Sequence, residues 1–223
     1  MKAVHNELFP TTVSVYEPDY KVTEEEIEFI KSIPIEKDWK GEVYMSISTS
    51  AVLENIKLKN IKDVMFQAAT RYAEDVLGIS NELAPLHSWI AKQETGGQHS
   101  MHNHTNTLFN LVYYIEGSEN NALRLELGNG RTRLQEGFNF DYNLNTYTPM
   151  NSNNAILHPK DGQIICIPGW VFHGTDISQG PRLCIGQNFF IKGNIGGDEL
   201  DSKFRLLDIE LDTKLSTRLD NDK

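Results

Sequence analysis

Hydrophobic and polar positions in the first third of the chain follow the period of an α-helix in two segments. The run Thr23-Glu-Glu-Glu26 has the form of a capping box, in which a threonine hydroxyl and a glutamate carboxylate satisfy free amides at a helix start. We therefore predict a short helix over about 24–32, closed before Pro34. A second helix is predicted over about 59–77, where apolar residues recur at helical spacing and Gly78 supplies a stop.

From Pro85 onward the pattern changes to short runs rich in β-branched and aromatic residues, separated by clusters of Gly, Asn, Ser and Asp. This spacing favours antiparallel hairpins over parallel strands joined by helices. The predicted strands cover 86–93, 107–115, 122–127, 137–142, 155–158, 163–168 and 182–191. We expect a mainly β fold with flanking helices, in which a sandwich, jelly roll or barrel is braced on its outer side by the two helices.

Composition narrows the partners that the chain can have. With 21 basic and 31 acidic residues the net charge is −10, so a small molecule or a protein side chain suits the chain better as a substrate than nucleic acid does. The longest nearly apolar stretch, 164–172, is broken by Pro168 and is too short for a membrane span of about 20 residues. The N-terminus lacks the pattern of a secretory signal, which favours a cytoplasmic location. Cys166 and Cys184 stand in apolar runs and are expected to be buried free thiols.

Three of the seven histidines fall in the segment His99-Ser-Met-His102-Asn-His104, directly before the strongest strand pattern. Side chains alternate along an extended chain, so His102 and His104 would project to one face and His99 to the other. Two imidazoles directed at one point need a third ligand from a distant strand to form the facial set with open positions of non-haem iron oxygenases. In this interpretation His99 is either an additional candidate ligand or a residue that contacts the ligands without binding the metal.

His173 is the predicted third ligand. The segment 162–173 has the pattern of a buried strand, a turn at Pro168-Gly169, and a histidine on the return. The spacing also resembles the cupin pattern, because Gly96 precedes His102 by six residues and Pro168 precedes His173 by five. We therefore predict a double-stranded β-helix (a cupin-like jelly roll) that binds a metal through His102, His104 and His173. The alternative is a solvated turn and a histidine satisfied within the core.

Arg182 lies nine residues after His173, at the start of a predicted strand. Strand alternation would turn Arg182, Cys184, Gly186 and Asn188 to the same, inward face. A buried arginine needs an anion, and its planar guanidinium suits a carboxylate held at two points. The anion could be the distal carboxylate of 2-oxoglutarate, or an aspartate or glutamate of the protein itself.

Together these segments resemble the 2-oxoglutarate/iron(II)-dependent oxygenase superfamily, and within it a group of small bacterial and phage proteins. The resemblance covers most of the chain and is carried by the segments 8–16, 88–90, 102–104, 111–115, 162–173 and 180–189. It implies a single oxygenase-like domain over 1–223, with a helical brace at about 20–80, a jelly-roll core at about 85–192 and a C-terminal extension at 193–223.

The resemblance also implies an activity and a site. Iron(II) would be held by His102, His104 and His173, and 2-oxoglutarate by Arg182 with Tyr114 and Asn110. The enzyme would use dioxygen to decarboxylate 2-oxoglutarate to succinate while it hydroxylates a small molecule or a protein side chain. The residues that would line the substrate side are Asn188, Trp170, Gln93 and Trp89.

Position 104 departs from the wider superfamily, most of whose members have an aspartate or glutamate there. Either the iron tolerates three neutral ligands, or a carboxylate such as Glu94 or Asp141 contributes, or His104 lies outside the ligand set. Two other functions stay open: a cupin-type three-histidine enzyme that does not use 2-oxoglutarate, and a non-catalytic jelly-roll binding module. Against the cupin reading, Leu108 and Phe109 stand where such cupins place a glutamate. No motif indicates the prime substrate or the oligomeric state.

Overall fold

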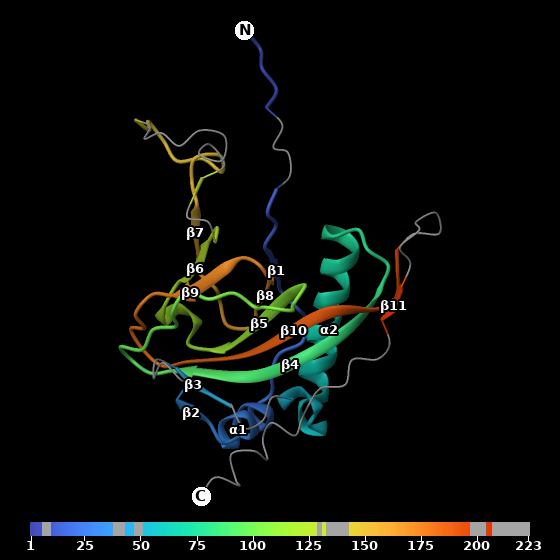
Figure 1. Ribbon diagram of the computed structural model, residues 1–223. Helices are drawn as coiled ribbons and strands as arrows, with labels where there is room; N and C mark the ends of the chain where they lie inside the picture. The colour runs from blue at the N-terminus through green and yellow to red at the C-terminus, as the bar shows by residue number, and fades with distance from the viewer. Residues whose placement is uncertain are drawn as a thin grey trace, which may run out of the picture.

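The structure is a computed structural model that describes residues 1–5, 10–37, 43–46, 51–128, 131–132, 143–196 and 204–206. Within these residues, two antiparallel sheets and two α-helices form the architecture (Figure 1). The strand predicted over 137–142, and with it Asp141, lies outside the described residues, as does much of the predicted C-terminal extension.

Both predicted helices are confirmed. Helix α1 (Glu24–Ser32) begins with the expected capping box, since the Thr23 side chain accepts from the Glu26 amide and the Glu26 carboxylate accepts from the Thr23 amide. Helix α2 (Lys59–Arg71) continues as a π-helical turn, η3 (Tyr72–Val76), and follows the short 3₁₀ turns η1 (Val52–Glu54) and η2 (Ile56–Leu58). No helix among the described residues is long and apolar enough to cross a membrane.

The strands form a large and a small sheet in the described part of the chain. In the large sheet the order is β1 (Ser14–Tyr16), β8 (Ile164–Pro168), β5 (Phe109–Glu116), β10 (Arg182–Ile195), β4 (Glu82–Gln93), β3 (Tyr44–Met45) and β2 (Glu36–Lys37), with β11 (Phe204–Leu206) beside β10. The small sheet has the order β7 (Asn154–Leu157), β6 (Leu123–Glu126) and β9 (Phe172–Thr175). The mainly β jelly-roll prediction is thereby confirmed.

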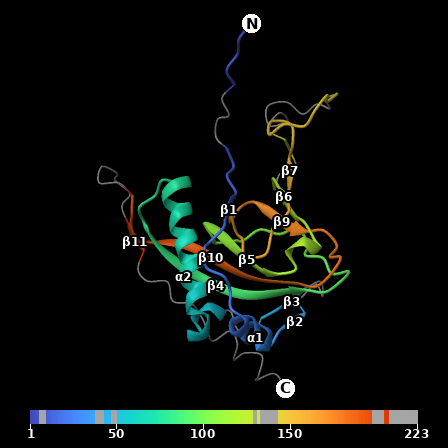
Figure 2. The same ribbon diagram turned by 180° about the vertical axis from the view of Figure 1, so that it is seen from behind.

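The large sheet separates two apolar clusters, because strand alternation sends successive side chains to opposite faces. On β5, Leu111 and Tyr113 pack with α1 and α2, whereas Val112 and Tyr114 pack toward the small sheet. Figures 1 and 2 show α2 on one side of the large sheet and β6, β7 and β9 on the other. The face away from the helices is therefore the floor of a cavity between the two sheets.

Both cysteines are free and buried, as predicted. Burial raises the pKa of the Cys166 and Cys184 thiols, so both stay protonated near neutral pH. They act as small apolar side chains in this fold.

Candidate metal centre

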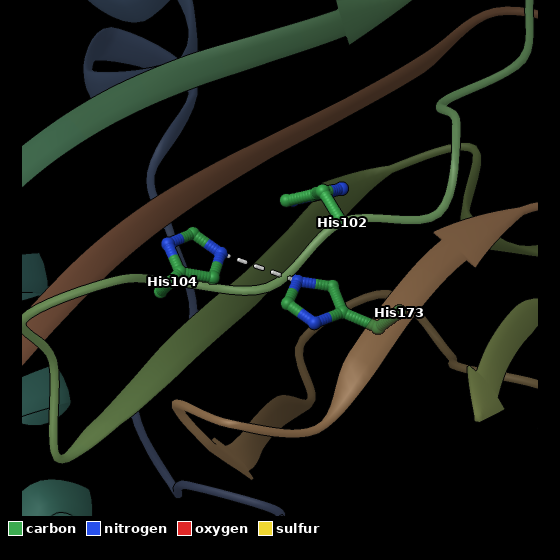
Figure 3. A group of neighbouring side chains, drawn as sticks. All are labelled: His102, His104 and His173. Atoms are coloured by element: carbon green, nitrogen blue, oxygen red, sulfur yellow. Dashed lines mark hydrogen bonds between the residues drawn. The ribbon is translucent and has the colours of Figure 1, made fainter. Parts of the chain in front are cut away.

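Three histidines meet at the mouth between the two sheets. His102 and His104 come from the irregular segment between β4 and β5, and His173 comes from β9. Their ligand atoms all lie within 4.8 Å of one another, and the Nε2 atoms of His104 and His173 are 3.3 Å apart. Figure 3 shows these two rings with nitrogens facing each other and His102 beside them. This spacing suits nitrogen atoms that bind one ion with bonds of about 2.1 Å.

The backbone fixes the histidine segment against β9. The His102 amide donates to the His173 carbonyl at 2.9 Å, and the His173 amide donates back to the His102 carbonyl at 2.8 Å. The chains approach so closely that a Cβ on Gly174 would lie 2.6 Å from the His99 carbonyl oxygen. Glycine at position 174 is thus required for the two ligand-bearing segments to lie side by side.

The prediction that His99 faces away from the other histidines is wrong. Its ring stacks on His102 with centroids 4.2 Å apart and lines the same cavity. The cause is that the segment around His102 forms an isolated bridge rather than a strand, so side chains do not alternate along it.

Hydrogen bonds orient two of the rings. Nδ1 of His102 lies 2.9 Å from the Ser100 carbonyl oxygen, and Nδ1 of His173 lies 3.2 Å from the Val171 carbonyl oxygen. A carbonyl can only accept, so each Nδ1 carries the proton and each Nε2 is the nitrogen that bears a lone pair. Both remaining lone pairs are the ones that a metal would use.

Burial keeps the His104 and His173 rings uncharged at neutral pH. Burial, together with the nearby His102 and His99, lowers the pKa of His104 to about 3. Burial likewise holds the pKa of His173 well below its usual value. Metal binding needs neutral imidazole, so the two side chains are in the binding form at neutral pH without losing a proton.

The Trp89 indole packs against the His104 ring. The two rings stack with centroids 5.4 Å apart and an interplanar angle of 19°. Trp89 can lie across β10 only because position 186 is glycine, since a Cβ on Gly186 would lie 2.3 Å from the indole. Trp89 also lines the cavity.

Arg182 lies in the same cavity, and its side-chain hydrogen bond among the described residues is to an amide rather than to a carboxylate. It is 5% exposed and donates from Nη1 to the Asn121 side-chain oxygen at 3.0 Å. Its guanidinium carbon lies 5.6 Å from the centre of the Tyr114 ring, and Nε is buried without a hydrogen-bond partner. No carboxylate of the described residues pairs with it. A buried guanidinium in this state favours the binding of an anion.

One cavity, partly open to solvent, joins the histidines to the arginine. Its walls come from β4, β5 and β10 of the large sheet, β6 and β9 of the small sheet, and the histidine segment. They are formed by Trp89, Ala91, His99, His102, His104, Val112, Tyr114, Leu123, His173, Gly174, Thr175, Arg182, Cys184 and Gly186.

Comparison with known proteins agrees with this arrangement. Residues 87–188, which contain the three histidines and Arg182, match the family model described as "Putative 2OG-Fe(II) oxygenase". This part of the chain is therefore similar to the 2OG-Fe(II) oxygenase family. No curated protein sequence matches the chain.

Solved structures of oxygenases share the fold at low sequence identity. A 2OG-Fe(II) oxygenase family oxidoreductase from Burkholderia pseudomallei is 13% identical, with a TM-score of 0.53 over 79% of this chain and 83% of that one. HygX from Streptomyces hygroscopicus, solved with nickel, 2-oxoglutarate and hygromycin B, is 13% identical, with a TM-score of 0.51 over 80% and 82%. A Pseudomonas putida prolyl-4-hydroxylase is 11% identical, with a TM-score of 0.53 over 82% and 94%.

Several residues predicted for the site lie outside the oxygenase cavity. Trp170 is 53% exposed, and Gln93 is buried with both ends of its amide engaged by Thr175 and Asn121. Neither lines the cavity, so their expected places on the substrate side are not found.

Asn110 and Asn188 were also predicted for the site and do not reach the cavity. They stand opposite each other on β5 and β10, yet neither lines the cavity. Both amide atoms of Asn110 and the Oδ1 atom of Asn188 are buried without a hydrogen-bond partner. These groups form an unsatisfied polar pair on the cavity side of the large sheet.

Of the two carboxylates considered as replacement ligands, the structure describes only Glu94. Glu94 lies at the surface, where it pairs with Lys92 at 2.7 Å. Asp141 is outside the described residues. Among the residues that can be placed, the metal-binding group consists of His102, His104 and His173.

Sequence reasoning missed two polar residues that contact the site, Thr175 and Asn121. Thr175 follows His173 by two positions on β9, so strand alternation could have placed it inward. Asn121 ends a polar turn in which no pattern distinguishes one side chain from the next.

Proposed function

We propose that the protein is a non-haem oxygenase that uses iron(II) and 2-oxoglutarate. The observation that carries the proposal is a single cavity with three clustered imidazoles at one place and, at another, a buried Arg182 that pairs with no carboxylate of the described residues. A metal site alone would not require the arginine, and a binding site for an anion alone would not require the histidines. A dianion that chelates a metal at one end and binds the arginine with its other end accounts for both the histidines and Arg182.

The residues present fit the iron ion. Imidazole nitrogen suits Fe(II), and three protein ligands leave positions for other groups. We assign His102, His104 and His173 as ligands, with Ser100 and Val171 carbonyls fixing two of the rings. Such outer partners set the ring orientation on which metal affinity depends.

The residues present also fit 2-oxoglutarate. Arg182 would hold the distal carboxylate, and Tyr114 lies against the guanidinium in the buried wall. Asn110 is four residues from Tyr114 on β5, about 13 Å along the strand, so it cannot share that carboxylate with Arg182. Asn110 also does not line the cavity, so the proposed contacts of 2-oxoglutarate are those of Arg182 and Tyr114.

Iron(II), 2-oxoglutarate and dioxygen together supply the oxidation, in which 2-oxoglutarate is decarboxylated to succinate. The chain contributes placement: the three histidines gather their ligand atoms at one point, Arg182 fixes the far end of the co-substrate, and the two sheets limit the access of water. The prime substrate is a small molecule or a protein side chain. HygX, solved with hygromycin B, and a prolyl-4-hydroxylase have the same fold, so that fold accommodates both classes.

The test of the proposed function is succinate formation. Aerobic protein loaded with Fe(II) is expected to convert 2-oxoglutarate to succinate slowly without a prime substrate, and faster when a substrate is added from a panel of amino sugars and proline-containing peptides. The rate should depend on the metal and stop on chelation. Succinate formation no faster than that of Fe(II) in buffer, with every member of the panel, would contradict the proposal.

A further inference from the structure

A second hollow lies on the α2 side of the large sheet, away from the histidines. This groove, which we call the α2 groove, runs between the end of α2, the turn η3 and the first residues of β4. Its apolar lining consists of Phe66, Ala73, Ile79 and Leu83. Phe66 is 37% exposed although its ring packs against Phe189, so part of the apolar lining faces solvent.

Charged side chains stand at the rim of the α2 groove. Glu74 and Glu82 are exposed there, and the Lys192 ammonium lies 3.6 Å from the Glu82 carboxylate. The lysine balances one of the two acidic charges, so the residues that line the groove keep a net negative charge. A segment that fills this groove is expected to be apolar where it meets the lining and basic where it meets the rim.

The last described strand leads the chain to this groove. β11 pairs antiparallel with β10, and its final residue, Leu206, is the partner of Gly193 (Figure 1). An antiparallel strand advances toward lower residue numbers of its partner, so the next step along the chain leads from Gly193 toward Lys192. Since Lys192 borders the groove, the segment that follows β11 begins at the groove edge.

The sequence after β11 has the pattern that such a groove would accept. Segment 207–219 has a leucine at every fourth position, and residues four apart lie on one side of an α-helix. Lys214 and Arg218 repeat the same spacing and each directly precedes one of these leucines. The acidic positions at the start of the segment, 208, 210 and 212, alternate with apolar ones, so an extended backbone would turn them away from the groove.

We propose that the α2 groove is the docking site of this chain's own segment 207–219. The leucines cover Phe66 and the apolar side chains beside it, and Lys214 and Arg218 meet the acidic rim. The groove is bordered by β4 and β10, which also supply Trp89 and Arg182 to the cavity. Docking therefore ties these two cavity-lining strands together at the ends that lie away from the cavity.

Cross-linking of the full chain identifies the occupant of the groove. The double variant Thr70→Cys/Leu211→Cys has one thiol in the groove lining and one in the segment, while both native cysteines are buried. A short bismaleimide is expected to join the two positions within one chain, which peptide mapping of the monomer detects. The control is Glu119→Cys/Leu211→Cys, because Glu119 is exposed on η4 (Ser118–Asn120), away from the groove, and it should link about tenfold less.

Limited digestion with trypsin tests the same contact without new thiols. Docking would shield the cleavage sites at Lys214 and Arg218, so the cleavage rate follows the population of undocked segment. Phe66→Asp places a charge on the apolar lining and should speed cleavage at both sites about tenfold or more. Glu74→Lys reverses one rim charge and should speed it about two- to fivefold, whereas Glu119→Lys makes the same change elsewhere and should leave the rate unchanged.

Three outcomes would overturn the inference. A link that joins two chains would make a second copy the occupant, and a yield no higher than that of the control would leave the groove without this segment. Cleavage of Glu74→Lys at the wild-type rate would remove the contact between the segment and the rim. Because Glu74 is exposed, this variant decides the question even where Phe66→Asp fails to fold.

Discussion

Replacing His102 or His173 with alanine is expected to abolish tight binding of Fe(II). Each supplies one of three ligand atoms in the group, and the remaining pair is too few to hold a weakly bound divalent ion. The affinity should fall by more than about 100-fold, because even the loss of a group that only orients a ligand costs about 10- to 100-fold. Anaerobic calorimetric titration with Fe(II) measures the change.

Two variants sharpen this experiment. His158→Ala alters an exposed histidine at the end of β7 and should bind Fe(II) as the wild type does. His104→Asp places at position 104 the carboxylate found in most of the superfamily and should retain binding, whereas His104→Ala should weaken it. Undiminished Fe(II) affinity in both His102→Ala and His173→Ala would remove these residues from the ligand set.

Replacing Arg182 with alanine is expected to weaken 2-oxoglutarate binding while leaving Fe(II) affinity unchanged. A two-point bond between guanidinium and carboxylate is worth about 1.5 to 3 kcal/mol, which corresponds to a loss of about one to two orders of magnitude in affinity. Arg182→Lys should recover only part of the loss, since an ammonium is a point charge without the planar fork. Titration of 2-oxoglutarate into anaerobic, Fe(II)-loaded protein gives the three affinities.

Arg71→Ala is the matched control, because this arginine lies exposed at the end of α2. It removes the same charge from the chain without touching the cavity, so it separates a local effect from one of net charge. Equal affinity for 2-oxoglutarate in the wild type and Arg182→Ala would refute the assignment of Arg182.

Those parts of the fold with a regular period were predictable from sequence. The capping box at Thr23 marked the start of α1, and strand alternation placed Arg182, Cys184 and Gly186 on the cavity face of β10. The two-residue strands β2 and β3 were not foreseen, since they are too short for any alternation to be recognised. β10 also continues to Ile195, beyond the predicted end at 191.

The predictions that were wrong concern side chains whose positions depend on irregular segments. The direction of the His99 ring depends on the paired backbone bonds between His102 and His173, which join parts of the chain far apart in sequence. The hydrogen bonds of Gln93 depend likewise on Asn121 and Thr175, from a turn and from another sheet. Such contacts follow from the packing of the two sheets and have no local signature, so composition and spacing could not reveal them.

The most direct measurement of the central claim is an anaerobic titration of the protein with Fe(II) and then with 2-oxoglutarate, followed by visible absorption. A metal held by the three histidines in the cavity that contains Arg182 predicts a charge-transfer band that appears only when both are present and is absent from His173→Ala. The band should saturate at one 2-oxoglutarate per chain. Absence of the band in wild-type protein that has bound Fe(II) would contradict a shared site for iron and 2-oxoglutarate.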